Sequence, residues 1–382
     1  MTGQSHHLAT PAGKKRARVL GVPFDGDPGP FNAITDVPGV EVGYHTLIAG
    51  RGKLVVGQGP VRTGVTAILP RGKRGVGLAC AAGLHSFNGN GEMTGAHWIN
   101  EAGSFNTPVM ITNTHAVGAI HSGTLNWVVK HYPKVAAEWL LPVVGETWDG
   151  YLNDINGDHV KPEMAGLALD AASSGPVEEG SVGGGTGMTC YSFKGGNGTA
   201  SRLVKFGGQN YVVGVFLQCN FGARHELTVA GKAIGKDLTA DDPIADYFSK
   251  GAQGAGSCIG ILATDAPLLP GQLQALARRI PLGLARTGTT GSHFSGDIFL
   301  AFSTANAGAF DSGFPTSDAD GARLARAQFV PWNFMDDFYV ATVHAAEESI
   351  INALVANETM IGRDGNRSPH LPHDAVKALF KS

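Results

Sequence analysis

A serine that follows small residues and opens an apolar strand is the feature of the sequence best suited to catalysis. Gly254, Ala255 and Gly256 lead into Ser257, and an apolar run follows over 257–264. The junction suits an amino-terminal nucleophile, because glycine lets the hydroxyl approach the preceding carbonyl carbon closely. Attack there, followed by hydrolysis of the ester, would free the α-amine of Ser257, whose ordinary pKa of about 7.7–8.0 suits it to accept the hydroxyl proton. Taken alone, the junction is explained more simply as a Gly-Ser loop before a strand.

Most other catalytic and ligand-binding motifs are absent from the sequence. It contains no GxxxxGK[ST] phosphate loop, no GxGxxG between a strand and a helix, no GxSxG elbow and no HExxH zinc motif. The segment 154–158 (DINGD) is like the start of a calcium loop, but Ala165 stands at the twelfth position, where such a loop needs glutamate. The four cysteines form no CxxC pair, which excludes a zinc ribbon and a redox motif of that kind.

Composition indicates a folded chain and excludes several partners. Apolar residues make up 43% of the 382 residues and charged residues only 16%, whereas a disordered chain is poor in apolar and rich in charged residues. The net charge of −3 disfavours a dedicated nucleic-acid binder. No run of 18 uncharged apolar residues is present, so we expect no transmembrane helix and no membrane partner.

The first 24 residues are expected to form an N-terminal arm outside the catalytic domain. Their basic cluster (Lys14, Lys15, Arg16 and Arg18) is interpreted as part of a solvated tail. The arm has no apolar h-region, so we expect no secretory signal and a cytoplasmic location. A periplasmic location stays open if the N-terminus has been trimmed.

Regular elements flank the serine on both sides in the sequence. Apolar runs and alternation predict strands, and a period of 3.6 residues predicts helices. Clustered strands with helices early and late in the chain favour a layered α/β or α+β architecture. The expected strands are 40–47, 66–69, 76–81, 109–112, 140–144, 202–206, 211–219, 257–264 and 296–304, and the expected helices are 115–130, 162–172, 267–279, 332–358 and 374–381.

A glycine-rich segment interrupts this pattern at 174–202. Nine of its 29 residues are glycine, too many for a regular helix or strand. One alternative function follows from it, a non-catalytic small-ligand or phosphate-binding protein that uses the loop 180–198. The loop lacks the GK[ST] lysine and the strand–helix context of phosphate loops, which argues against this alternative.

Five longer motifs resemble the β-peptidyl aminopeptidase and L-aminopeptidase/D-esterase family. The resemblance extends over about residues 25–360. The motifs lie at 38–48 (PGVEVGYHTLI), 145–160 (GETWDGYLNDINGDHV), 180–202 (GSVGGGTGMTCYSFKGGNGTASR), 256–279 (GSCIGILATDAPLLPGQLQALARR) and 295–306 (SGDIFLAFSTAN).

The resemblance implies a four-layer αββα sandwich of Ntn-hydrolase-like architecture, formed by residues 25–382 as one catalytic domain. It implies self-cleavage between Gly256 and Ser257 into a large subunit, 1–256, and a small subunit, 257–382. The two would stay together and assemble into a homo-oligomer such as a tetramer of heterodimers. The implied reaction removes an N-terminal residue (a β-amino acid such as β-alanine, or a small L- or D-residue) from short peptides, amides and esters with a free amino terminus. Neither a metal nor an organic cofactor would take part.

The resemblance also implies catalytic roles for four residues. Ser257 would be the nucleophile and, through its freed amine, the general base. Ser295, in the SGD motif, would position or relay protons at the nucleophile, and Asp297 would polarise that network, where some relatives have glutamate. The amide of Asn220, in QCNFG, would point at the oxyanion. Without the motifs around them, the last three would be read as ordinary turn or strand-end residues.

Four further residues are expected to bind substrate. Glu146 matches the acid that pairs with the free ammonium group of the substrate. Trp148 stands where some relatives have a tyrosine whose hydroxyl helps the oxyanion, and we expect it to form a pocket wall. Tyr151 is displaced from that position by three residues. Gly184 and Gly185 are expected either to form tight turns or to bring their backbone amides close to the nucleophile.

Overall fold

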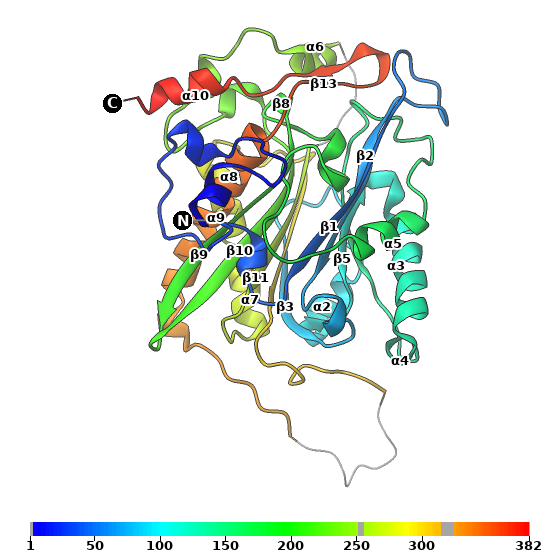
Figure 1. Ribbon diagram of the computed structural model, residues 1–382, viewed down its shortest axis with the longest axis vertical. Helices are drawn as coiled ribbons and strands as arrows, with labels where there is room; N and C mark the ends of the chain where they lie inside the picture. Colours follow the sequence, from blue (N-terminus) through cyan, green and yellow to red (C-terminus); the bar gives the residue numbers. More distant parts are fainter. Residues whose placement is uncertain (1–2, 251–255, 315–323, 382) are drawn as a thin grey trace.

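Two β-sheets pack face to face at the centre of the protein, and helices cover the outer face of each sheet (Figure 1). The computed structural model describes residues 3–250, 256–314 and 324–381. The order helix–sheet–sheet–helix is the αββα sandwich expected from the motifs, and the layered architecture predicted from the elements is therefore confirmed.

The strand that begins with Ser257 lies inside the larger sheet. This sheet has the order β4-β3-β12-β11-β10-β9, in which β11 pairs antiparallel with β10 and parallel with β12. The smaller sheet has the order β1-β2-β5-β6. The strands are β1 (Glu41–Ala49), β2 (Val61–Leu69), β3 (Cys80–Ser86), β4 (Ser104–Phe105), β5 (Val109–Asn113), β6 (Val143–Thr147), β9 (Gly196–Phe206), β10 (Gln209–Asn220), β11 (Ser257–Thr264) and β12 (Gly296–Ser303).

Helices cover the two sheets from opposite sides, with α3 and α5 on the smaller sheet and α7, α8 and α9 on the larger sheet (Figure 1). Among the described residues, no helix is both long and apolar enough to cross a membrane. The helices are α1 (Gly3–Leu8), α2 (Ala96–Ala102), α3 (Val117–His131), α4 (Pro133–Ala136), α5 (Glu163–Asp170), α6 (Pro243–Ser249), α7 (Pro270–Ala277), α8 (Ile280–Arg286), α9 (Asp336–Val355) and α10 (His373–Leu379).

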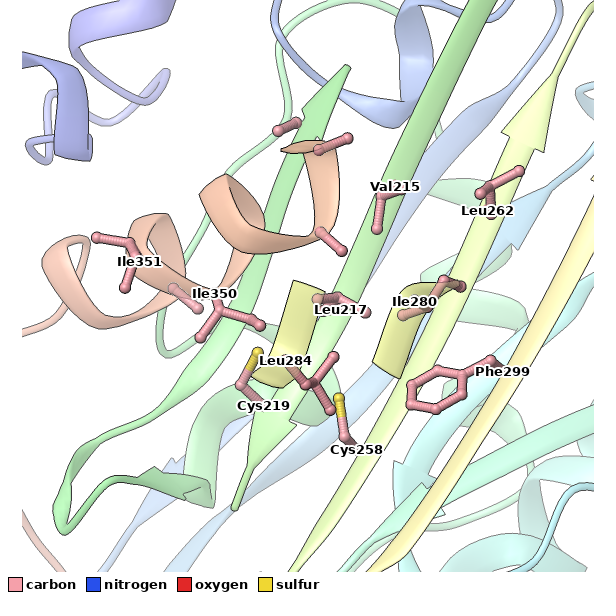
Figure 2. Packing of buried hydrophobic residues seen from close by; sticks show 14 of the residues in the cluster. Val215, Leu217, Cys219, Cys258, Leu262, Ile280, Leu284, Phe299, Ile350 and Ile351 are labelled. Atoms are coloured by element: carbon pink, nitrogen blue, oxygen red, sulfur yellow. The ribbon is translucent and has the colours of Figure 1, made fainter. Parts of the chain in front are cut away.

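Alternation along β10 separates two apolar layers. Val215 and Leu217 pack beneath α8 and α9, next to Leu284 and Ile350 (Figure 2). Phe216 lies between them in sequence and points to the opposite face, into the layer between the sheets. Asn220, at the end of the strand, is in phase with Phe216. Its side chain is therefore directed between the sheets.

Glycine lets helix backbones lie directly on the strands, as two positions illustrate. A Cβ on Gly198 of β9 would lie 1.9 Å from the carbonyl oxygen of Ser349 in α9. A Cβ on Gly43 of β1 would lie 2.2 Å from the carbonyl oxygen of Ala168 in α5. Both distances are shorter than any real carbon–oxygen contact. Part of the high glycine content therefore reflects close packing between layers.

The N-terminal segment is packed against the body, so its interpretation as a solvated tail is wrong. Arg16 is buried, and its Nε lies 2.8 Å from Glu179 Oε2. Arg18 Nε lies 2.6 Å from Glu348 Oε1 of α9. The basic residues at these two positions pair with buried carboxylates, a contact that sequence spacing could not reveal.

Two predicted strand boundaries are also wrong. β9 begins at Gly196, inside the segment that seemed too rich in glycine for a strand. Pairing with β10 from Gly196 onward supplies the hydrogen bonds that local propensity does not predict. β3 spans Cys80–Ser86 rather than 76–81, because it pairs with β12 over that stretch.

Candidate active site

The register of the larger sheet brings the predicted catalytic residues together at one end. Ser257 opens β11 and lies opposite Asn220, the last residue of β10. On its other side it lies beside Gly296, the first residue of β12, which is flanked by Ser295 and Asp297. The Ser257 side chain is buried, 2% exposed, and directed between the sheets.

Two donors hold the hydroxyl oxygen of Ser257. Asn220 Nδ2 lies 3.2 Å from Ser257 Oγ, and the backbone N–H of Trp148 donates to the same oxygen at 3.2 Å. Asn220 Nδ2 also donates to the Trp148 carbonyl oxygen at 2.8 Å. Because Trp148 follows β6, these contacts join the ends of the two sheets at the nucleophile.

Ser295 and Asp297 form a buried hydrogen-bonded pair next to the junction. Ser295 Oγ donates to Asp297 Oδ1 at 2.6 Å. A Cβ on Gly256 would lie 3.1 Å from Ser295 Oγ, so this hydroxyl contacts the residue before the nucleophile. The carbonyl oxygen of Gly256 accepts the N–H of Gly296 at 3.1 Å. The predicted residues Gly254 and Ala255 lie outside the described residues.

Asn88 is a further residue of this network that the sequence did not reveal. Its Nδ2 donates to Asp297 Oδ2 at 2.9 Å, and its Oδ1 accepts the Asp297 backbone N–H at 2.6 Å. Burial raises the pKa of Asp297, and the hydrogen bonds from Ser295 and Asn88 partly oppose that rise. The two residues are 209 positions apart, and no motif in the sequence links them.

Glu146 is a buried carboxylate that forms no ion pair with the described residues, although the nearby His115 side chain favours its charged form. It is 3% exposed, and it accepts hydrogen bonds from the Thr114 hydroxyl and, at 3.0 Å, from the Glu92 backbone N–H. Burial raises its pKa, and these two hydrogen bonds partly oppose the rise. Gly91 lies between the Glu146 carboxylate and the start of β12, since a Cβ there would contact both Glu146 Oε1 and Gly296. The carboxylate is therefore close to the nucleophile.

The backbone N–H of Trp148, and not its indole, donates a hydrogen bond to the nucleophile. Its side chain packs against a small apolar cluster that includes Tyr151 and Leu152. The hydroxyl of Tyr151 donates to the Arg367 carbonyl oxygen at 3.0 Å and lies in that cluster. The second donor at Ser257 is thus the backbone N–H of Trp148, which any residue except proline could supply.

Gly184 and Gly185, which are predicted to bind substrate, are packed inside the protein. Both are buried between the sheets, where a Cβ would collide with Gln218 and Asn197, respectively. The Gly184 N–H donates to Thr66 Oγ1 at 3.1 Å, and the Gly185 N–H to the Val182 carbonyl oxygen at 3.0 Å. Both of these amides therefore have acceptors inside the protein, and a role of the two glycines in substrate binding stays a prediction. The ligand-binding alternative for this loop therefore lacks support.

Over residues 3–250, 256–314 and 324–381, no group of three or more histidine, cysteine, aspartate or glutamate side chains is arranged to hold a metal ion.

Known proteins are similar to this chain in sequence and in fold. Residues 32–368 match peptidase family S58. The chain belongs to this family. It is 50% identical over 374 residues to the beta-peptidyl aminopeptidase BapA of Sphingosinicella microcystinivorans, in an alignment that covers 96% of this chain and 92% of that protein.

Solved structures agree with the S58 assignment. The L-aminopeptidase D-Ala-esterase/amidase of Ochrobactrum anthropi, described as a prototype of the serine aminopeptidases and a variant of the Ntn hydrolase fold, is 44% identical with a TM-score of 0.87. The match covers 95% of this chain and 97% of that structure. A β-aminopeptidase of Burkholderia sp. is 42% identical with a TM-score of 0.84, covering 94% and 97% of the two chains. The protein is a serine aminopeptidase of family S58 with an Ntn-hydrolase-like fold.

Proposed function

We propose that the protein removes the N-terminal residue from short peptides, amides and esters through an acyl-enzyme on Ser257. The observation that carries this proposal is the buried Glu146 carboxylate beside the nucleophile. A buried carboxylate that forms no ion pair with the described residues is suited to the ammonium group of a substrate with a free amino terminus. The names of two relatives, a beta-peptidyl aminopeptidase and an L-aminopeptidase, support the same function.

The site geometry supports a stepwise acyl transfer. With its ammonium group at Glu146, the substrate would place its carbonyl carbon at Ser257 Oγ. The hydroxyl attacks, and its proton passes to the α-amine of the mature Ser257. Asn220 Nδ2 and the Trp148 N–H would stabilise the negative oxygen of the tetrahedral intermediate. The bond to the leaving group breaks as that group takes the proton, and water then hydrolyses the ester.

We further propose that the Gly256–Ser257 bond cleaves itself to create this amine. Ser257 Oγ attacks the Gly256 carbonyl carbon, the C–N bond breaks, and the nitrogen of Ser257 takes up a proton to become the free amine. The Gly296 N–H, 3.1 Å from the Gly256 oxygen, would stabilise the charge that develops there. The hydroxyl proton would pass toward Ser295 and Asp297. Water hydrolyses the ester and leaves a carboxylate on Gly256.

A substrate panel tests the aminopeptidase proposal. We expect hydrolysis of at least one of the β-alanyl, L-alanyl and D-alanyl amides, and no hydrolysis of the same amides after N-acetylation. The comparison among the three also decides between β-amino, L- and D-residues. Equal rates for free and acetylated amides would contradict a role for Glu146 in binding the amino terminus.

We also propose that the two subunits stay together and form a homo-oligomer. Leu324 is 96% exposed, and three aromatic residues that follow it, Phe329, Trp332 and Phe334, are exposed as well. Apolar side chains gathered on one segment are more often covered in an assembly than left in water. Light scattering on the purified protein should give a mass several times that of one chain. A mass equal to one chain would contradict the oligomer.

We propose a cytoplasmic location because the cysteines are free thiols. All four are buried free thiols, which is the usual state in a reducing compartment. Fractionation of the source cells should find the activity in the cytoplasm, and its recovery in a periplasmic extract would favour the alternative.

A further inference from the structure

A strained two-residue turn lies next to the amide that faces the nucleophile. β7 (Thr189–Cys190) and β8 (Phe193–Lys194) form a hairpin, joined by Tyr191 and Ser192. The φ angles of these two residues are 51° and 56°. Residues with side chains rarely adopt such angles, which persist only where surrounding contacts impose them.

Contacts from outside the hairpin hold this turn. The Arg224 guanidinium donates to the Ser192 carbonyl oxygen at 2.5 Å and to the Tyr191 carbonyl oxygen at 3.2 Å. It also lies 3.6 Å from the centre of the Phe193 ring. The Tyr191 hydroxyl is 2.7 Å from Thr287 Oγ1. The hairpin is therefore built to keep one conformation.

Lys194 closes the open end of the hairpin from inside the protein. Its side chain is fully buried, and its Nζ donates to the Met188 carbonyl oxygen at 2.6 Å and to the Gly195 carbonyl oxygen at 2.7 Å. Met188 directly precedes β7 and Gly195 directly follows β8, so one side chain ties both strands together. Lys194 forms no salt bridge with the described residues, although the charge of Asp149 acts on it and favours its protonated form.

The environment of Lys194 matches an amine that donates two hydrogen bonds. Burial lowers the pKa of Lys194 to about 7. Two carbonyl oxygens accept from it, which is the number of N–H bonds on a neutral amine. Burying a lysine that forms no ion pair is unfavourable for stability, and a methionine would fill a similar volume. Its presence here is better explained by what it positions.

The hairpin in turn sets the orientation of the Asn220 amide. The N–H of Thr189, the residue after Met188, donates to Asn220 Oδ1 at 2.9 Å. With the amide oxygen held on that side, Nδ2 must face the other way. There it donates to the Trp148 carbonyl oxygen and lies 3.2 Å from Ser257 Oγ.

We propose that Lys194 is a positioning residue for catalysis, acting through the Met188 and Gly195 carbonyls and the Thr189 N–H on the amide of Asn220. Lys194 touches neither the reacting atoms nor the substrate. It keeps the Asn220 N–H directed at the carbonyl oxygen of a substrate bound to Ser257. This inference rests on the proposed acyl transfer, in which that N–H stabilises the oxyanion.

The test compares Lys194→Met with Lys205→Met. Methionine keeps an unbranched apolar side chain but donates no hydrogen bond, and Lys205 is an exposed lysine of β9 in the same sheet. For a free-amine amide, Lys194→Met should lower kcat tenfold to a hundredfold and leave KM within twofold of wild type. Lys205→Met should change neither constant. Rates are normalised to the fraction of chains that begin at Ser257, so that a defect in self-cleavage is not counted as lost catalysis.

A double-mutant cycle separates positioning from a general structural effect. Asn220→Ala removes the amide, so adding Lys194→Met to it should change kcat by less than twofold. The same loss of kcat in both backgrounds, or an unchanged kcat in Lys194→Met, would overturn the proposal. If Lys194→Met does not fold, Lys194→Gln, which has two N–H donors on a shorter chain, carries the same cycle. Turnover by wild type alone tests the proposed function, whereas the ratio of variant to wild type tests Lys194.

Discussion

At the scale of single residues, Glu146 is the proposed determinant of substrate binding. Glu146 is buried and forms no ion pair within the described part of the chain, and burial raises its pKa. The ionised form is the one that attracts an ammonium group, so binding should weaken as pH falls through that raised pKa. The weakening should begin at a higher pH than for an exposed glutamate, because burial disfavours the charge.

Glu146→Gln should reduce kcat/KM for free-amine substrates about tenfold to a hundredfold or more, since a hydrogen bond to a charged group contributes about 1.5–3 kcal/mol. Thermal denaturation should show that the fold is retained. Glu101→Gln, at an exposed position of α2, is the matched control and should behave as wild type. Unchanged kcat/KM in Glu146→Gln would exclude this carboxylate from substrate binding.

Asp297 should influence the base through its negative charge. If the α-amine of mature Ser257 is the base, kcat/KM rises with pH through the pKa of that amine, about 7.7–8.0 in an unperturbed chain. The Asp297 charge favours the ammonium form and so raises that pKa. Asp297→Asn should therefore move the acidic limb of the profile to lower pH and also slow the reaction.

The control for this pH experiment is Ser295→Ala. It removes the hydrogen bond to Asp297 but leaves the charge, so the plateau should fall while the limb stays in place. Profiles of kcat/KM against pH for wild type and both variants provide the measurement. A limb that does not move in Asp297→Asn would show that this carboxylate is not coupled to the base.

At the scale of elements, a buried ion network joins α9 to β9 and to the N-terminal segment. Glu348 of α9 is fully buried and accepts hydrogen bonds from Arg202 at 2.7 Å and from Arg18 at 2.6 and 2.7 Å. Burial raises the pKa of Glu348, but the two guanidinium groups outweigh it and lower the pKa to about 2. The charged form is therefore strongly favoured in the folded protein.

Glu348→Gln should lower the free energy of unfolding by about 3–5 kcal/mol, because it leaves Arg202 buried without its carboxylate. In wild type, the contribution of this carboxylate should be complete above about pH 4.3, its ordinary pKa, and be lost as pH falls toward 2. Denaturant unfolding at pH 7 and pH 3 measures both effects. Glu358→Gln, at an exposed position, should change stability by less than about 0.5 kcal/mol.

At the scale of the whole molecule, the fold explains how a cleaved chain would stay intact. β11 begins at the proposed cleavage site and is hydrogen-bonded on one side to β10, from the large subunit, and on the other to β12, from the small subunit. Helix α9, from the expected small subunit, covers β9 and β10, and α7, from the same subunit, packs on β3 of the expected large subunit. Separation of the fragments would therefore expose the core.

Wild type should run as two bands on a denaturing gel, residues 1–256 and 257–382, and as one species on a native column. Ser257→Ala should give a single, inactive chain with the same fold by circular dichroism, because it lacks only the attacking oxygen. N-terminal sequencing identifies the new end. A mature protein without a chain that begins at Ser257 would contradict self-cleavage at this bond.

The sequence alone was enough for features that depend on local pattern. The strand 257–264 was predicted with the bounds that the structure has, because a continuous apolar run is a local property. The family resemblance also predicted catalytic roles for Ser257, Ser295, Asp297 and Asn220. The register of the larger sheet brings these four residues together.

Tertiary structure decided the contacts between distant residues. Asn88 holds Asp297 across 209 positions, and the donor at Ser257 is the Trp148 backbone, which no residue type reveals. In the sequence, the glycine-rich loop around Gly184 is like a loop that binds a ligand. In the structure, the Gly184 N–H donates to Thr66 Oγ1. Such contacts depend on how the two sheets and their helices pack. Packing is a property of the whole chain, so the neighbours of one position in the sequence do not determine it.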